Sequence, residues 1–135
     1  MDRRTFVRSA AAATGCGALL TACASLPYVA GSPGPRGIEV PAAAMTELDF
    51  ALVEVPGRDY PVFLSRSGED FRAVSTRCTH RGCTVKPTGA RLECPCHGSR
   101  FEFDGTHIDG PAPTGLDTYE VIPGTETIVI LVGEA

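Results

Sequence analysis

The sequence predicts an all-β protein, and three observations carry that prediction. Short runs rich in β-branched and aromatic residues recur about every ten residues from Ile38 onward. Glycine and proline clusters separate these runs, as they do in turns. No stretch after the N-terminal region shows the helical period of an amphipathic helix. With 135 residues the chain has room for one small antiparallel β-domain or sandwich.

Three hairpins are expected within this domain. In chain order the paired runs are 59–65 with 70–76, 101–103 with 106–108, and 116–122 with 126–132. The loop RSGED joins the first pair. Asp104-Gly105 joins the second and favours a tight turn with positive φ. The third turns around Pro123-Gly124, where proline and glycine interrupt the strand pattern.

Residues 1–22 are expected to form a twin-arginine signal peptide. A twin-arginine pair, Arg3-Arg4, precedes a weakly apolar Ala/Gly stretch that is too short to span a bilayer. The stretch ends in Leu20-Thr21-Ala22-Cys23, which resembles a lipobox, so Cys23 is the expected lipidation site. An ordinary secretory signal or a retained membrane anchor, with Cys23 incidental, are the alternatives. Because the twin-arginine route carries folded proteins, it suits a chain that receives its cofactor before export.

Residues 23–37 are expected to form a lipidated, flexible linker rich in Pro, Gly and Ser, with an r.m.s. reach of about 20 Å. The domain is then expected over residues 38–135. From Cys23 onward the chain carries nine Lys and Arg against fifteen Asp and Glu, a side-chain charge of −6. Such a balance argues against nucleic acid or an anionic membrane surface as the main partner.

Four of the six cysteines lie in one nineteen-residue stretch, within the motifs CTHRGC (78–83) and CPCHGS (94–99). The spacing does not match the Cys and His spacing of zinc fingers. One thiol and one imidazole from each motif would suit a binuclear site, with two cysteines on one metal and two histidines on the other. A zinc site and a pair of disulfides without metal are the alternatives.

These two motifs, followed by GPAP at 110–113, resemble those of Rieske iron–sulfur proteins, and the likeness extends over about residues 38–132. The resemblance implies an antiparallel β-sandwich with a small cluster-binding subdomain formed by two loops. It implies one [2Fe–2S] cluster, and the matching ligands are Cys78, His80, Cys94 and His97. Two thiolates leave an oxidised cluster neutral, which makes it an easier electron acceptor than one held by four thiolates.

The resemblance also assigns roles around the cluster. Cys83 and Cys96 match a pair that forms a disulfide in quinol-oxidising members; two free thiols are the alternative. Ser99 matches a serine whose hydroxyl donates to a cluster sulfur, and Phe101 stands where those members usually have a donor tyrosine. A reduction potential below that of typical quinol-oxidising members is therefore expected. Gly110, Pro111 and Pro113 match the proline loop that shields the cluster from water.

Charged side chains near the motifs depart from that pattern or lie outside it. Arg81 replaces a common leucine of the apolar docking tip, and a guanidinium there resists burial in an apolar crater. It favours an acidic or polar partner surface. His107 is expected to be a surface strand residue without a ligand role, and Lys86 and Arg100 are expected to be solvated surface charges.

The predicted function is an exported, membrane-tethered electron carrier on the extracytoplasmic face of a bacterial membrane, proton-coupled through the ligand histidines. No substrate pocket or nucleophile–base pair is evident, so an electron carrier or redox subunit is expected rather than an enzyme by itself. Redox proteins are the expected partners, with quinol-oxidising or cytochrome components among them. The alternatives are a Rieske subunit of a quinol–cytochrome c oxidoreductase, the small subunit of a periplasmic oxidase, and a zinc-binding interaction module.

Overall fold

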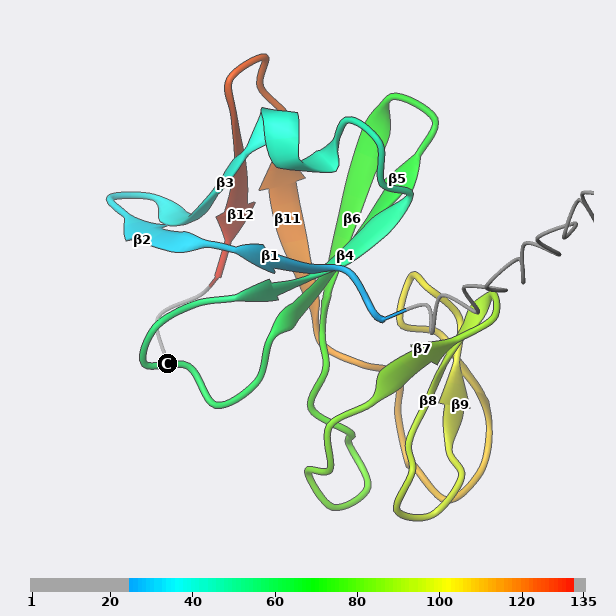
Figure 1. The fold of residues 1–135 in the computed structure, drawn as a ribbon. Helices are drawn as coiled ribbons and strands as arrows, with labels where there is room; N and C mark the ends of the chain where they lie inside the picture. The colour runs from blue at the N-terminus through cyan, green and yellow to red at the C-terminus, as the bar shows by residue number, and fades with distance from the viewer. Residues whose placement is uncertain (1–24, 133–135) are drawn as a thin grey trace, which may run out of the picture.

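Two β-sheets make up residues 25–132, the part of the chain that the computed structural model describes (Figure 1). The larger has eight strands in the order β1-β4-β5-β6-β11-β12-β3-β2 and is nearly closed; the smaller has four in the order β10-β9-β8-β7. The strands of the larger sheet are β1 (Tyr28–Ala30), β2 (Ser32–Gly34), β3 (Gly37–Pro41), β4 (Phe50–Glu54), β5 (Val62–Ser67), β6 (Asp70–Ser75), β11 (Thr118–Ile122) and β12 (Thr127–Leu131). Those of the smaller are β7 (Lys86–Thr88), β8 (Arg91–Glu93), β9 (Arg100–Phe101) and β10 (His107–Asp109).

The all-β prediction is confirmed. Within residues 25–132 the one helix is a short 3-10 turn over Ala42–Met45. The three expected hairpins are present as β5–β6, β9–β10 and β11–β12, each antiparallel. Gly68 turns the first hairpin with φ +64°, a conformation that glycine adopts without steric cost. At the second, the Gly105 N–H donates to the Glu102 carbonyl and φ of Gly105 is +91°.

The expectation of a flexible linker over residues 23–37 is wrong for residues 28–34. Residues 28–34 form β1 and β2, which lie at opposite edges of the larger sheet and nearly close it. β1 pairs in parallel with β4, and β2 pairs antiparallel with β3. Of the prolines that suggested a flexible linker, Pro33 is tolerated within β2 because β2 is an edge strand, where one side of the backbone has no ladder to complete.

A glycine at the centre of this segment allows the closure. Gly31 lies between β1 and β2, and its N–H donates to the Glu54 carbonyl at 2.8 Å. A Cβ placed there would come within 2.8 Å of the side chains of Val53 and Ile38. The backbone therefore passes this close to the core only because the residue has no side chain.

The central strands β4, β5 and β6 are buried on both faces, because side chains alternate between faces along a strand. One face packs into the core of the nearly closed sheet, and the other packs against the small sheet and the loops that carry the cysteines. On β5, Val62 and Leu64 belong to the first core and Phe63 to the second. On β6, Ala73 belongs to the first and Val74 to the second. The cysteine loops are thus built onto the outer face of the main sheet.

Among the described residues 25–132, no helix is long and apolar enough to cross a membrane.

Candidate metal centre

The two predicted motifs form two loops with the same backbone design. One runs from Cys78 to Cys83 between β6 and β7, and the other from Cys94 to Ser99 between β8 and β9. In each, the first cysteine accepts from the N–H of a glycine four residues later and donates its own N–H to a carbonyl five residues later. Those glycines, Gly82 and Gly98, have φ of +76° and +77°. Each motif therefore needs its glycine to close the loop.

The four cysteines of the described residues divide into a bonded pair and two free thiols. Cys83 and Cys96 form a disulfide that joins the two loops, as the resemblance implied. Cys78 and Cys94 are free and buried, 2% and 1% exposed. The Cys94 sulfur lies within 4.8 Å of both disulfide sulfurs. Because those two sulfurs are bonded to each other, that group of three is not a ligand set, and Cys78 and Cys94 are the thiols left to bind a metal.

The two motif histidines come together at the edge of the same site. The rings of His80 and His97 are perpendicular, with centroids 4.7 Å apart. His80 is half-buried and His97 is exposed. The His80 Nδ1 is buried and has no hydrogen-bond partner among the described residues. A buried ring nitrogen of this kind is costly unless something binds it.

The ionisation tendencies of these groups fit a metal centre. Burial lowers the pKa of His80, and nearby His97 and Arg81 lower it further, which favours the neutral imidazole that binds metals. Burial raises the pKa of the Cys78 thiol, and the neighbouring Cys94 adds to that rise. Two buried thiolates would therefore need a positive charge beside them. With buried sulfur donors and outer nitrogen donors, the four side chains fit a [2Fe–2S] cluster with mixed ligands.

The predicted proline loop lies against the second cysteine loop. The Ala112 N–H donates to the Ser99 hydroxyl oxygen at 3.0 Å, which leaves the hydroxyl proton of the buried Ser99 free for another acceptor. Gly110 has φ +92°, and a Cβ there would come within 2.5 Å of the Ser99 Cα. Pro111 and Pro113 are exposed, whereas Ala112 between them is buried. The loop therefore presents its prolines to solvent and its backbone to Ser99.

Phe101 and His107 lie beside this loop. Phe101 is fully buried, in the same apolar core as Cys78 and Cys94. His107 is on β10, half-buried, with its ring edge-on to Phe101 at 5.7 Å and its Nε2 3.2 Å from the Gly110 carbonyl oxygen. The structure thus places His107 behind the proline loop and not with the other two histidines.

The expectation of a purely solvated Arg100 is corrected. Its guanidinium binds the Asp109 carboxylate through two nitrogens, one of them at 2.8 Å, across the β9–β10 pair. The hydrogen bonds raise the pKa of Arg100 and lower that of Asp109. The ion pair fixes Asp109, the residue before Gly110, so Arg100 helps to position the start of the proline loop.

Sequence patterns missed the contacts that fasten the first cysteine loop to the rest of the molecule. The Tyr60 hydroxyl donates to the Gly82 carbonyl at 2.6 Å, across 22 residues of sequence. The Thr76 hydroxyl donates to the Pro61 carbonyl, and the Thr79 hydroxyl to the Thr114 carbonyl. No motif connects these positions: packing of the β4–β5 loop brings the first two pairs together, and the segment between β10 and β11 supplies Thr114.

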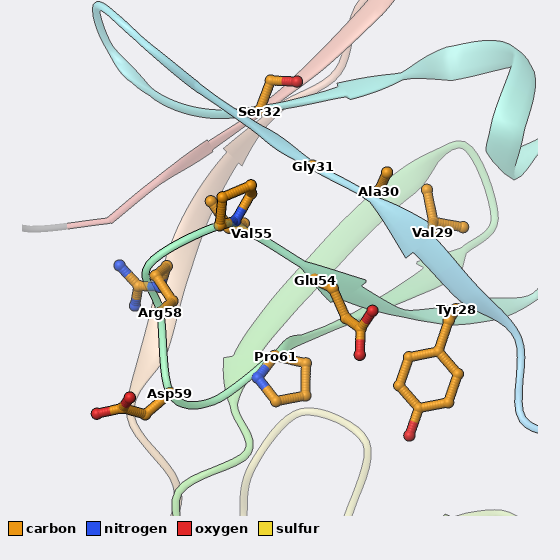
Figure 2. A pocket seen from close by; sticks show the side chains of 11 residues that line it. Tyr28, Val29, Ala30, Gly31, Ser32, Glu54, Val55, Arg58, Asp59 and Pro61 are labelled. Carbon is orange, nitrogen blue, oxygen red and sulfur yellow. The ribbon is translucent and has the colours of Figure 1, made fainter.

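A larger hollow of the described surface lies elsewhere. It has a volume of about 650 Å³ and lies between β1 and the loop that follows β4. Figure 2 shows Tyr28, Glu54, Arg58 and Asp59 around it, with no cysteine or histidine. Metal-ligand chemistry, and not cavity size, therefore identifies the functional site.

The fold and this donor set define a Rieske-type iron–sulfur protein. The family model of the Rieske [2Fe-2S] domain matches residues 39–120. The chain therefore belongs to the Rieske [2Fe-2S] domain family, and it binds one [2Fe–2S] cluster and transfers electrons.

Known proteins of this family give finer comparisons. The chain is 42% identical over 65 residues to the cytochrome b6-f complex iron-sulfur subunit of Chlorobaculum tepidum, covering 47% of this chain and 36% of that one. The plasma membrane Rieske protein PetC3 from Synechocystis PCC 6803 superimposes with a TM-score of 0.56 at 28% identity, covering 67% of this chain and 93% of that one. The complex of reduced oxygenase and oxidized ferredoxin in carbazole 1,9a-dioxygenase gives a TM-score of 0.52 at 26% identity, covering 70% and 92%.

Proposed function

We propose that Cys78, His80, Cys94 and His97 hold the [2Fe–2S] cluster, with the thiolates on the inner iron and the imidazoles on the outer. The buried, unpartnered Nδ1 of His80 is the single observation that carries this assignment. The two free thiols of the described chain are buried in an apolar core, on the same two loops as His80 and His97. The Cys83–Cys96 disulfide holds the two loops together beside them.

The chain's own residues would then govern both electron and proton exchange. When bound, the cluster supplies a site that accepts and releases one electron. Burial of both cysteines keeps water from the inner half, and the Ser99 hydroxyl has a proton free to donate toward a cluster sulfur. His80 would bind through Nδ1, so its Nε2 is the atom that exchanges a proton with solvent. The exposed ring of His97 offers a second such nitrogen.

We propose that the protein is an exported, membrane-tethered carrier of single electrons. The support is the twin-arginine pair Arg3-Arg4 and the lipobox-like sequence before Cys23, all outside the described residues. The plasma membrane location in the name of the Synechocystis relative agrees with this proposal. Arg81, exposed beside His80, disfavours docking in an apolar quinol pocket.

A second candidate function is a subunit of a larger oxidoreductase, such as a quinol–cytochrome c oxidoreductase or a periplasmic oxidase. The identity to a cytochrome b6-f iron-sulfur subunit favours it. Chemical crosslinking in native membranes distinguishes the two functions. A subunit would be recovered in one stable stoichiometric complex, whereas a carrier would exchange between partners.

Iron and inorganic sulfide analysis tests the ligand assignment. Wild-type protein should contain two of each per chain and show a rhombic electron paramagnetic resonance (EPR) signal when reduced. His80→Ala and His97→Ala should each lose the cluster, while His107→Ala, the matched control, should retain it. Unchanged iron in either ligand variant would disprove the assignment.

The N-terminus is tested separately. Mass spectrometry of the mature protein should detect an acylated Cys23, and Cys23→Ala should release the protein from membranes. A membrane-bound Cys23→Ala protein would instead indicate a retained anchor.

A further inference from the structure

Positive charge is concentrated in the stretch that contains both cysteine loops. Residues 72–100 contain six of the nine Lys and Arg of the described chain and one acidic residue, Glu93, for a net charge of +5. The remaining described residues contain three Arg and thirteen Asp and Glu, for a net charge of −10. An acidic protein therefore carries most of the basic residues of its described part in the stretch of sequence that contains its two cysteine loops.

Half of these six cations have carboxylates close by. Arg72 lies 4.0 Å from Asp104, and Arg100 is paired with Asp109. Lys86 is directly opposite Glu93 across the β7–β8 pair, where side chains share a face. Of the other three, Arg91 is on β8 and acts electrostatically on Asp109. That leaves Arg81 in the first cysteine loop and Arg77 directly before it.

These two arginines flank His80 along the chain, and both are exposed. The Arg77 Nε lies 3.5 Å from the position that a Cβ on Gly82 would occupy, so its side chain lies over the turn. With His80 they line a hollow of about 260 Å³, in which Asp117 is the one acidic lining residue. Neither arginine has a carboxylate within 4.0 Å among residues 25–132.

We propose that the surface formed by Arg77, His80 and Arg81 docks the acidic surface of a redox partner protein. Covering exposed guanidinium groups with apolar surface would leave them desolvated and unpaired, whereas carboxylates from a partner would satisfy them. Docking here would bring the partner against the His80 ring, the outer end of the centre. The inference depends on the proposed function, because His80 matters only as a cluster ligand.

An anionic membrane is the other surface that could attract these arginines. The thirteen carboxylates outside residues 72–100 oppose it, because a planar anionic surface would repel them as the arginine surface approached. A protein partner presents a local acidic patch and avoids that repulsion. The charge distribution therefore favours a protein.

Small charged one-electron oxidants test the electrostatic potential at the surface beside the centre. The reduced holoprotein is mixed with anionic ferricyanide or with cationic tris(phenanthroline)cobalt(III), each of which takes one electron. At about 0.1 M salt the Debye length is about 10 Å, so nearby charges dominate. Arg81→Glu and Arg77→Glu should each lower the rate of electron transfer to ferricyanide about five-fold and raise the rate to the cobalt complex. Arg81→Gln, with half the charge change, should give about two-fold.

Arg36→Glu is the matched control, because Arg36 is an exposed arginine at the β2–β3 turn, on the far side of the larger sheet from β7–β9 (Figure 1). It makes the same change in net charge and should leave both rates nearly unchanged. Equal effects of Arg36→Glu and Arg81→Glu would overturn the proposal, because net charge alone would then explain the rates.

Macromolecular probes distinguish the occupants. An acidic c-type cytochrome should accept electrons faster from wild type than a basic one does, and Arg81→Glu should abolish that preference. Cosedimentation with vesicles containing about 30% phosphatidylglycerol should be negligible for protein that lacks the lipid. Vesicle binding that requires Arg77 and Arg81 would overturn the protein partner in favour of a membrane.

The two levels of the proposal fail differently. Wild-type protein without a rhombic EPR signal would overturn the proposed function and this docking surface with it. An intact signal in every variant, with rates that do not respond to Arg77 or Arg81, would overturn the docking surface alone.

Discussion

His80 divides the centre into an inner and an outer half. Its Nδ1 is buried and unpartnered, while the residue as a whole is half-exposed beside His97. Cys78 and Cys94, which are proposed to complete the ligand set, are buried. As a ligand, the His80 ring would therefore give electrons a short path from a water-excluded site to the surface.

Phe101 is the residue from which a lower reduction potential is expected. Phe101→Tyr should raise the reduction potential, because a hydroxyl that donates to a ligand sulfur stabilises the added electron. A net hydrogen bond of about 1 kcal/mol corresponds to roughly 40 mV for one electron. Redox titration measures it, with Phe103→Tyr as control. No rise, or an equal rise in both variants, would contradict this role for position 101.

Tyr60 is the residue that fastens the first cysteine loop to the main sheet. Tyr60→Phe should lower the free energy of unfolding by about 1 kcal/mol, because the Gly82 carbonyl loses its donor. It should also shift the EPR g-values, since the loop that carries His80 is less restrained. The control is Tyr119→Phe, whose hydroxyl has no partner in the described part of the chain. A stability loss with unchanged g-values would leave Tyr60 a purely structural role.

The two cysteine loops, as elements, share one backbone pattern but receive their support from different places. The first is held by Tyr60 of the β4–β5 loop, which donates to Gly82, and by Thr79, which donates to the Thr114 carbonyl. The second is held by the proline loop through Ser99. The disulfide then joins the loops to each other. This division explains why a short disulfide-bonded pair of loops can hold a fixed geometry.

Gly110 tests the proline loop as an element. Gly110→Ala should lower the free energy of unfolding by about 3 kcal/mol or more, because positive φ and the close Ser99 backbone both oppose a Cβ. It should also speed cluster loss to an iron chelator. Gly89→Ala has positive φ but open space, so it should cost only about 1 kcal/mol. Equal costs would show that contact with Ser99 is unimportant.

The whole molecule is expected to unfold as one unit, because β4, β5 and β6 supply both cores. Phe63 connects the sheet to the cluster-binding part, with ring centroids 4.8 Å from Phe103 and 5.5 Å from Phe50. The cluster therefore depends on packing of the main sheet as well as on its own loops.

Phe63→Ala should lower the free energy of unfolding by about 3–5 kcal/mol. Bleaching of the cluster and loss of the β-sheet circular dichroism signal should shift together in a denaturant titration. Ile122→Ala, at an exposed position, should change little. Bleaching well before loss of the sheet signal would show that the cluster-binding part unfolds independently.

The sequence determined the strand hairpins, the two cysteine motifs and the family, because each depends on residues close together in the chain. Alternation along 59–65 and 70–76 predicts a hairpin, and a glycine at the fourth position after each first cysteine closes its loop. The sequence did not predict the strands within residues 28–34, because proline and glycine there suggested a flexible linker.

Only the tertiary structure decided which groups act together across the chain. Tyr60 meets Gly82 and Arg100 meets Asp109, whereas among residues 25–132 no carboxylate lies within 4.0 Å of Arg77 or Arg81. Folding brings some charges and donors together and separates others. Closure of the larger sheet by β1 and β2 likewise depends on edges contributed by β4 and β3. Local patterns record what a segment prefers, whereas pairing between distant segments is settled by packing.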